Sequence, residues 1–92
     1  DAIFYGRIYG NSMQPTMFGG NSPIFIRYQD DGITMLPEGT IIRYLSDVNT
    51  MRVHRIKGTY PTYYMVQGDN NKYDEKVYPE NITDINIGVL WT

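Results

Sequence analysis

The chain of 92 residues contains no cysteine and only one histidine, His54. Without cysteine there is neither a disulfide framework nor a thiolate metal site. A lone imidazole with no second one nearby is a poor zinc ligand, so we expect no metal site. His54 is instead the one candidate in this chain for a neutral general base.

Clustered basic residues and long apolar runs are also missing. The eight Lys and Arg residues are scattered, and the formal net charge is -2. Because phosphate binding needs clustered basic side chains, this charge pattern argues against a nucleic-acid partner, and we expect none. No apolar run approaches the roughly 20 residues that span a bilayer, and nothing resembles a signal peptide. We therefore expect the chain as given to be soluble.

What the sequence has in abundance is β-forming residues, including nine tyrosines. Short runs rich in Tyr, Ile, Val and Thr alternate with turn signals, and helical periodicity is scarcely visible. The pattern predicts strands near residues 3–9, 23–28, 40–45, 51–57, 62–67 and 84–91. Turns are predicted at 18–22, 30–32, 37–39, 46–50 and 68–71. The length suits one all-β domain covering residues 1–92.

The predicted strand at 51–57 places the histidine on a definite face. Alternation puts one set of side chains on one face and a second set, which includes His54, on the other. The first set is Met51, Val53, Arg55 and Lys57, and the second is Arg52, His54 and Ile56. Ser12 lies at the junction between the first predicted strand and an irregular turn, where a side chain can project into a cleft.

Ser12 and His54 together suggest nucleophilic catalysis. A serine hydroxyl is a poor nucleophile until a neighbouring base takes its proton, and a carboxylate usually orients that base. Each residue also has a simpler interpretation, since serines are common in turns and a strand histidine is often a half-buried structural residue. Taken alone, the residue chemistry supports a Ser/His hydrolase.

Four motifs resemble those of the signal peptidase I family. Ser-Met-Gln-Pro-Thr at 12–16 is similar to its serine box, usually Ser-Met-x-Pro, and Pro-Glu-Gly-Thr-Ile-Ile at 37–42 resembles its Gly-Asp-Ile-Val strand. Val-His-Arg-Ile at 53–56 falls where the base lies, and Val-Gln-Gly-Asp-Asn-Asn at 66–71 resembles its Gly-Asp-Asn-Asn box. The order and rough spacing agree over about residues 8–90. Bacterial members carry lysine at the base position, so His54 resembles the endoplasmic-reticulum and archaeal branch.

The resemblance implies a fold and a reaction. The fold would be two antiparallel sheets of short strands, as in signal-peptidase and LexA-like peptidases. Ser12 would attack the amide bond after a small residue of an exported precursor, with His54 as general base. Met13 would line the pocket for that residue, and Pro15 would fix the turn that presents Ser12. The precursor would bind as an extended strand, and no metal or organic cofactor is implied.

The resemblance also implies a membrane setting. The chain begins with Asp1, so we expect an excised catalytic domain whose upstream transmembrane anchor has been removed. In the full-length protein the domain would face the extracytoplasmic or lumenal side. Met13, Met17 and Phe18, if exposed together, would make a surface for the membrane interface. The sequence leaves open whether the protein has accessory subunits.

Two departures from the family pattern concern the oxyanion and the acid. Gly10 stands where many members have a serine that helps bind the oxyanion, so any oxyanion hole must rely on backbone N–H groups such as that of Ser12, or on another side chain. The branch places its acid six residues after the aspartate of the Gly-Asp box. Counting without a gap gives Glu75, a turn one residue shorter gives Asp74, and Asp69 in the box is a third candidate. We favour Asp74, because a shorter side chain fixes an imidazole more firmly. Asp69, next to a glycine, is expected to shape the turn.

Two competing functions use the same features. A LexA-like domain that cleaves its own chain would use a lysine, and Lys57 is the only one near His54. A non-catalytic peptide-binding or assembly module would keep the fold after losing activity, and the altered acid spacing supports that alternative.

Overall fold

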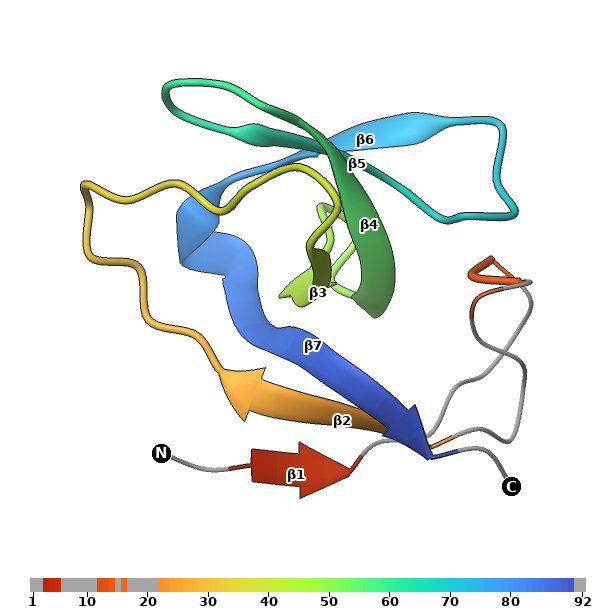
Figure 1. Ribbon diagram of the computed structural model, residues 1–92. Helices are drawn as coiled ribbons and strands as arrows, with labels where there is room; N and C mark the ends of the chain where they lie inside the picture. The colour runs from red at the N-terminus through yellow and green to blue at the C-terminus, as the bar shows by residue number, and fades with distance from the viewer. Residues whose placement is uncertain (1–2, 6–11, 15, 17–21, 91–92) are drawn as a thin grey trace.

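The computed structural model describes residues 3–5, 12–14, 16 and 22–90. Within them the chain is all-β, as predicted. The elements are β1 (Ile3–Tyr5), β2 (Ser22–Arg27), β3 (Ile41–Leu45), β4 (Met51–Thr59), β5 (Tyr64–Gln67), β6 (Asp74–Val77), the 3-10 turn η1 (Pro79–Asn81) and β7 (Ile82–Leu90). Their arrangement is shown in Figure 1. None of the described residues belongs to a helix long and apolar enough to cross a membrane.

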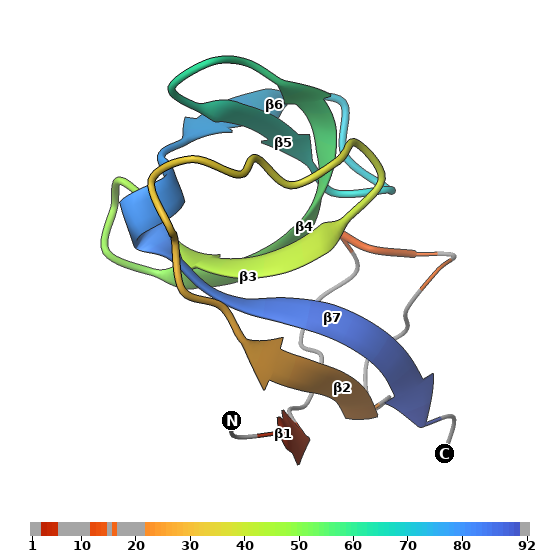
Figure 2. The same cartoon turned by 60° about the vertical axis from the view of Figure 1, so that its left-hand side comes forward.

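The described strands form one antiparallel sheet in the order β1-β2-β7-β3-β4-β5-β6, so the expectation of two sheets is not confirmed. β7 is the physical reason, because this nine-residue strand pairs with β2 on one side and with β3 on the other. Register shifts occur in the β2–β7, β3–β7 and β4–β5 pairs. Such bulges bend and twist a sheet, and β5 and β6 come to lie opposite β3 (Figure 2).

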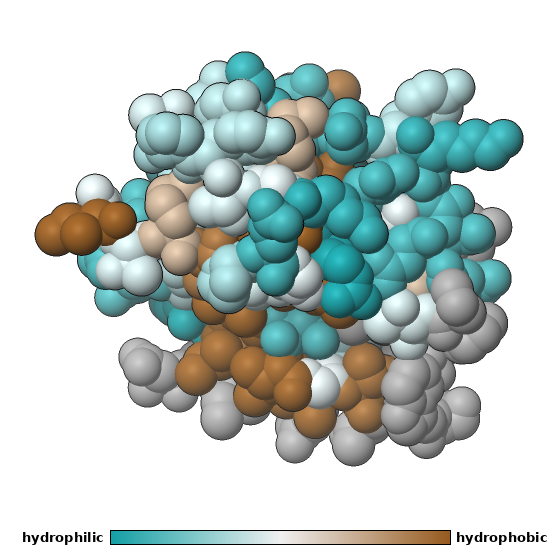
Figure 3. All heavy atoms as spheres, turned by 45° about the horizontal axis from the view of Figure 1, so that its top comes forward, coloured by the Kyte–Doolittle hydropathy of each residue, from teal (hydrophilic) through white to brown (hydrophobic). Residues whose placement is uncertain are grey.

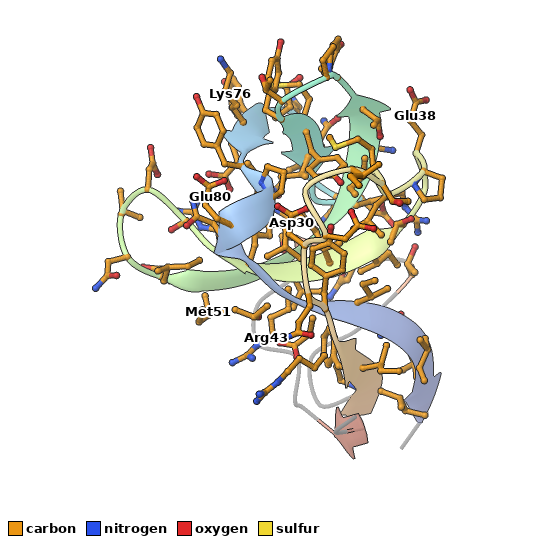
Figure 4. All side chains as sticks on the ribbon, turned by 90° about the vertical axis from the view of Figure 1, so that its left-hand side faces the viewer. Asp30, Glu38, Arg43, Met51, Lys76 and Glu80 are labelled. Atoms are coloured by element: carbon orange, nitrogen blue, oxygen red, sulfur yellow. The ribbon has the colours of Figure 1, made fainter. Side chains whose placement is uncertain are left out.

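The core fills the space inside this curved sheet. Its buried members come from β3 to β7: Ile42, Tyr44, Ile56, Tyr64, Val66, Val77 and Ile82. Charged side chains such as Glu38 and Lys76 point outward from the periphery (Figure 4), and Glu80 is also exposed. The described residues on the face seen in Figure 3 are largely hydrophilic, with a group of apolar side chains in the lower part of the view. The only buried polar or charged side chains in the described part are Ser46, His54 and Asp84.

Five predicted strands correspond to β2, β3, β4, β5 and β7 with ends within two residues, while the first extends past the described β1. The faces predicted for residues 51–57 are also confirmed. His54 and Ile56 are 9% and 0% exposed, whereas Met51 is 38% exposed and Lys57 is exposed. The alternation therefore grouped the histidine correctly with Ile56, and burial shows that this is the inner face of β4.

β6 was not predicted, because Asp-Glu-Lys-Val at 74–77 has the composition of a charged loop. It is a strand because it pairs with β5 along its whole length, from Gln67↔Asp74 to Tyr64↔Val77. Val77 closes the core at 3% exposure. β6 lies at an edge of the described sheet, where charged side chains are common because they discourage further pairing. This strand brings a carboxylate toward the histidine.

Candidate active site

Ser12 lies in a short turn that is docked against the loop between β5 and β6 (Figure 1). Its backbone carbonyl accepts a hydrogen bond of 2.7 Å from the Asn70 N–H. A Cβ atom on Gly68 would lie only 2.5 Å from that same carbonyl oxygen. Gly68 is therefore required by close approach of the Ser12 backbone, which explains physically why a glycine stands in this box.

Met13 anchors the same turn. Its side chain is 2% exposed and packs against Ile41, Val53 and Val89. Its sulfur accepts a hydrogen bond of 3.4 Å from the Asp69 N–H. So little of its surface is free that these contacts do not support the predicted role in lining a substrate pocket. Four other residues for which the sequence predicted a role lie outside the described residues: Gly10, Pro15, Met17 and Phe18.

Asp69 ties the turn to β4. Its two carboxylate oxygens accept hydrogen bonds of 2.9 Å each from Nε and Nη2 of Arg55. The Thr16 hydroxyl donates to the same carboxylate. Hydrogen bonding from Arg55 is the main reason that the pKa of Asp69 lies below its ordinary value. Asp69 thus bridges the Ser12 turn and Arg55, in keeping with the structural role predicted for it.

We expect Asp69→Asn to lower the free energy of unfolding by about 1–3 kcal/mol, the range for breaking a charge-assisted hydrogen-bonded pair. The amide keeps the shape but turns an N–H₂ group toward the Arg55 guanidinium. Denaturant unfolding measures the change. Asp74→Asn is the matched control, because Asp74 is exposed, and it should shift stability by no more than about 0.5 kcal/mol. Equal stability of the two variants would contradict the bridging role.

His54 contacts Ser12 on one side of its ring and a tyrosine on the other. Nε2 lies 3.2 Å from the Ser12 Oγ, and Nδ1 lies 2.8 Å from the Tyr44 hydroxyl. The register pairs Tyr44 with Arg52 and Ile42 with His54, so Tyr44 and His54 are diagonal neighbours on the inner face. The serine and the histidine that the sequence motifs singled out are thus in contact, and the fold adds a tyrosine that no motif indicated.

A carboxylate completes this set of side chains. The Tyr44 hydroxyl donates a hydrogen bond to Oε1 of Glu75 on β6. Arg52 on β4 donates a second one, of 2.9 Å, to the same oxygen. The result is a continuous chain of hydrogen bonds from Ser12 through His54 and Tyr44 to Glu75.

Glu75, not the favoured Asp74, is the acid that enters the cluster. Successive side chains of a strand point to opposite faces, so only one of two adjacent acids can face inward. Asp74 is exposed, whereas Glu75 is partly buried and bonded to Tyr44. Glu75 is also the residue that the ungapped count of six gives, and that spacing was the available signal. The reason for preferring Asp74, its shorter side chain, does not apply in this geometry, because Tyr44 lies between Glu75 and His54 and hydrogen-bonds both.

The charge states follow from burial and partners. Burial is the main cause that lowers the pKa of His54 below 6.5, which leaves the imidazole neutral at neutral pH. Burial opposes ionisation of Glu75, but hydrogen bonds from Tyr44 and Arg52 outweigh it and lower the pKa of Glu75. Burial, reinforced by Glu75, raises the pKa of Tyr44 far above its ordinary value. At neutral pH the cluster therefore holds a neutral base, a protonated phenol and a carboxylate.

The described residues include no group of three or more His, Cys, Asp or Glu side chains that could hold a metal ion. Lys57, the alternative base, is exposed on the face of β4 opposite His54. What the arrangement can do chemically is activate the hydroxyl of Ser12.

Comparison with protein-family models, with curated proteins and with solved structures finds no match for this chain. A functional conclusion must therefore rest on the motifs and on the geometry of the site.

Proposed function

We propose that this domain is a serine endopeptidase of the signal-peptidase type, with Ser12 as nucleophile and His54 as general base. The observation that carries the proposal is the 3.2 Å contact between Ser12 Oγ and His54 Nε2. Burial that lowers the pKa of His54 keeps this base unprotonated at neutral pH. The motif order around both residues supports the assignment to precursor cleavage.

The chemistry proceeds in two steps. As Ser12 Oγ attacks the scissile carbonyl, its proton moves to Nε2 of His54, and this proton is then given to the leaving amine. Water, activated by the same nitrogen, hydrolyses the acyl-enzyme. The negative charge that develops on the carbonyl oxygen needs N–H donors, and the backbone N–H of Ser12 is the candidate within the described residues.

The substrate in this proposal is an exported precursor cut after a small residue. It binds as an extended strand, so that main-chain hydrogen bonds supply affinity and a small pocket supplies specificity. β1 and β6 are the edges of the described sheet, and β6 also carries Glu75. An upstream membrane anchor, with the domain on the extracytoplasmic or lumenal face, belongs to the same proposal.

The two competing functions are less well supported by the geometry. A LexA-like mechanism needs a lysine beside the serine, and Lys57 is exposed on the other face of β4. A non-catalytic peptide-binding module has no need for a neutral histidine hydrogen-bonded to a serine hydroxyl, yet it shares the fold. Chemical labelling of the nucleophile distinguishes the proposed function from both alternatives.

We expect a serine-reactive acylating probe to label the wild-type protein once, on Ser12, as read by intact and peptide mass spectrometry. Ser12→Ala and His54→Ala should lose the label, because one lacks the nucleophile and the other its base. Ser22→Ala on β2 is the matched control and should be labelled like the wild type. An unlabelled wild type would favour the binding module, and loss of label in Lys57→Ala but not in His54→Ala would favour the LexA-like mechanism.

A further inference from the structure

We propose that Tyr44 and Glu75 act together as positioning residues, with the carboxylate setting the tautomer of His54 through the tyrosine hydroxyl and not by direct contact. This inference rests on the proposed function for its catalytic meaning. The third member of the site is then a Tyr–Glu pair in place of a single acid.

The tautomer of His54 follows from the protons available along the hydrogen bonds that join Glu75, Tyr44 and His54. An ionised carboxylate only accepts hydrogen bonds, so the one hydroxyl proton of Tyr44 must be donated to Glu75. Toward His54, 2.8 Å away, the Tyr44 oxygen can then only accept. Nδ1 of His54 must therefore carry the imidazole proton. Nε2 keeps its lone pair, and that lone pair is directed at the Ser12 hydroxyl.

The opposite arrangement would disable the base. If Tyr44 donated to Nδ1, the imidazole proton would sit on Nε2 and would point at Ser12, so that Nε2 could not accept the serine proton. Tyr44 has only one hydroxyl proton, and Glu75 competes for it with a full negative charge. The charge on Glu75 thus sets which partner donates in each hydrogen bond from Glu75 to Ser12, and it sets the direction that leaves Nε2 free to accept the serine proton.

Two further features hold this direction in place. Arg52 donates to the same oxygen of Glu75 and so keeps the carboxylate ionised and oriented. Tyr44 is fully buried, so water cannot replace its hydroxyl between the ring and the carboxylate. Glu75 therefore supplies the charge that sets the tautomer, and Tyr44 supplies the fixed hydroxyl that transmits its effect to the imidazole.

The tautomer can be measured directly, because the chain has one histidine. In ¹⁵N NMR spectra at neutral pH, a protonated and an unprotonated imidazole nitrogen have clearly different shifts. We expect the wild type and Ser12→Ala to show the proton on Nδ1. Glu75→Ala frees the Tyr44 proton for Nδ1 and should move the imidazole proton to Nε2, although Glu75 makes no hydrogen bond to the ring. Tyr44→Phe removes the acceptor, so the preference for Nδ1 should be lost.

Activity provides the second measurement. Glu75→Ala and Tyr44→Phe should each lower kcat by about 10²–10⁴, since a wrong tautomer in a serine protease triad costs around 10⁴. In the Tyr44→Phe background, Glu75→Ala should have no further effect on the tautomer, because its influence passes through the missing hydroxyl. Asp74→Asn is the control for a nearby charge. Tyr64→Phe is the control for a buried hydroxyl, since its oxygen bonds the Leu36 N–H instead.

The results distinguish failure of this inference from failure of the proposed function. If Glu75→Ala keeps the proton on Nδ1, the inference is overturned, whatever Ser12→Ala does to cleavage. If Ser12→Ala still cleaves while Glu75→Ala moves the imidazole proton, the nucleophile assignment fails and the control of the tautomer stands. Because Glu75 is on an edge strand and partly exposed, this variant folds more readily than one in the core, and it decides the question even if Tyr44→Phe is unstable.

Discussion

Replacing Ser12 with alanine is expected to abolish cleavage of a model precursor that carries alanine before the cut. Removing the nucleophile of a serine protease costs on the order of 10⁶ in kcat, and what remains comes from binding and oxyanion stabilisation alone. The assay is appearance of the cleaved product by mass spectrometry, at enzyme concentrations high enough to detect that residual rate.

The same variant should fold normally. The turn is held by the Ser12 backbone carbonyl, which accepts from Asn70, and by the buried Met13 side chain. Neither contact involves the hydroxyl, so thermal unfolding should match that of the wild type. Ser22→Ala is the control for loss of a hydroxyl elsewhere, and it should retain full cleavage. Wild-type activity in Ser12→Ala would remove this residue from the mechanism.

The part of the site that was predictable from the sequence depends on local geometry. Side chains alternate along a strand with a period of two, so the pattern at 51–57 was enough to put His54 on the same face as Arg52 and Ile56, opposite Val53. The glycine of the 66–71 box was visible as a turn signal. Its reason, close approach of the Ser12 backbone, involves contacts across more than 50 residues and has no local signature.

The part that was not predictable depends on pairing between distant strands. Tyr44 has the sequence character of an ordinary core tyrosine, and only the β3–β4 register puts its hydroxyl beside His54. Adjacent acids in a strand pose a harder problem, because a shift of one residue exchanges their faces. The choice between Asp74 and Glu75 therefore depended on the pairing of β6 with β5, and β6 itself had the composition of a loop.

The sheet topology shows a similar limit. The strand pattern predicted most of the strands but not how they join, and two sheets were expected. One long strand, β7, pairs on both sides and makes the described sheet continuous. Bulges then supply the curvature that two separate sheets would otherwise provide. In the proposed function the single sheet matters because its curvature brings Glu75 on β6 toward Tyr44 on β3.

His54→Ala is the second variant with a very large expected effect. Without the base, the Ser12 hydroxyl keeps its proton, and turnover should fall nearly as far as in Ser12→Ala, because the two residues act as a unit. Lys57→Ala should retain nearly wild-type turnover, since Lys57 is exposed on the opposite face of β4. The two variants are compared by kcat/KM on the same model precursor. The opposite ranking would establish the lysine mechanism.

The pH dependence of the wild type gives an independent check on the base. Protonation of His54 stops catalysis, so the acid limb of kcat/KM reports its pKa in the free enzyme. Burial is the main cause that lowers this pKa, Arg52 adds to it, and Glu75 and Asp69 oppose it. The acid limb should therefore lie below the ordinary histidine value of about 6.5. The same shift contributes stability above pH 6.5 that is lost as the pH falls from there toward the folded-state pKa, because the unfolded chain binds the proton first. His54→Ala should remove this contribution to the pH dependence of unfolding, whereas Lys57→Ala should retain it. An acid limb well above 6.5 would contradict a buried neutral histidine as the base.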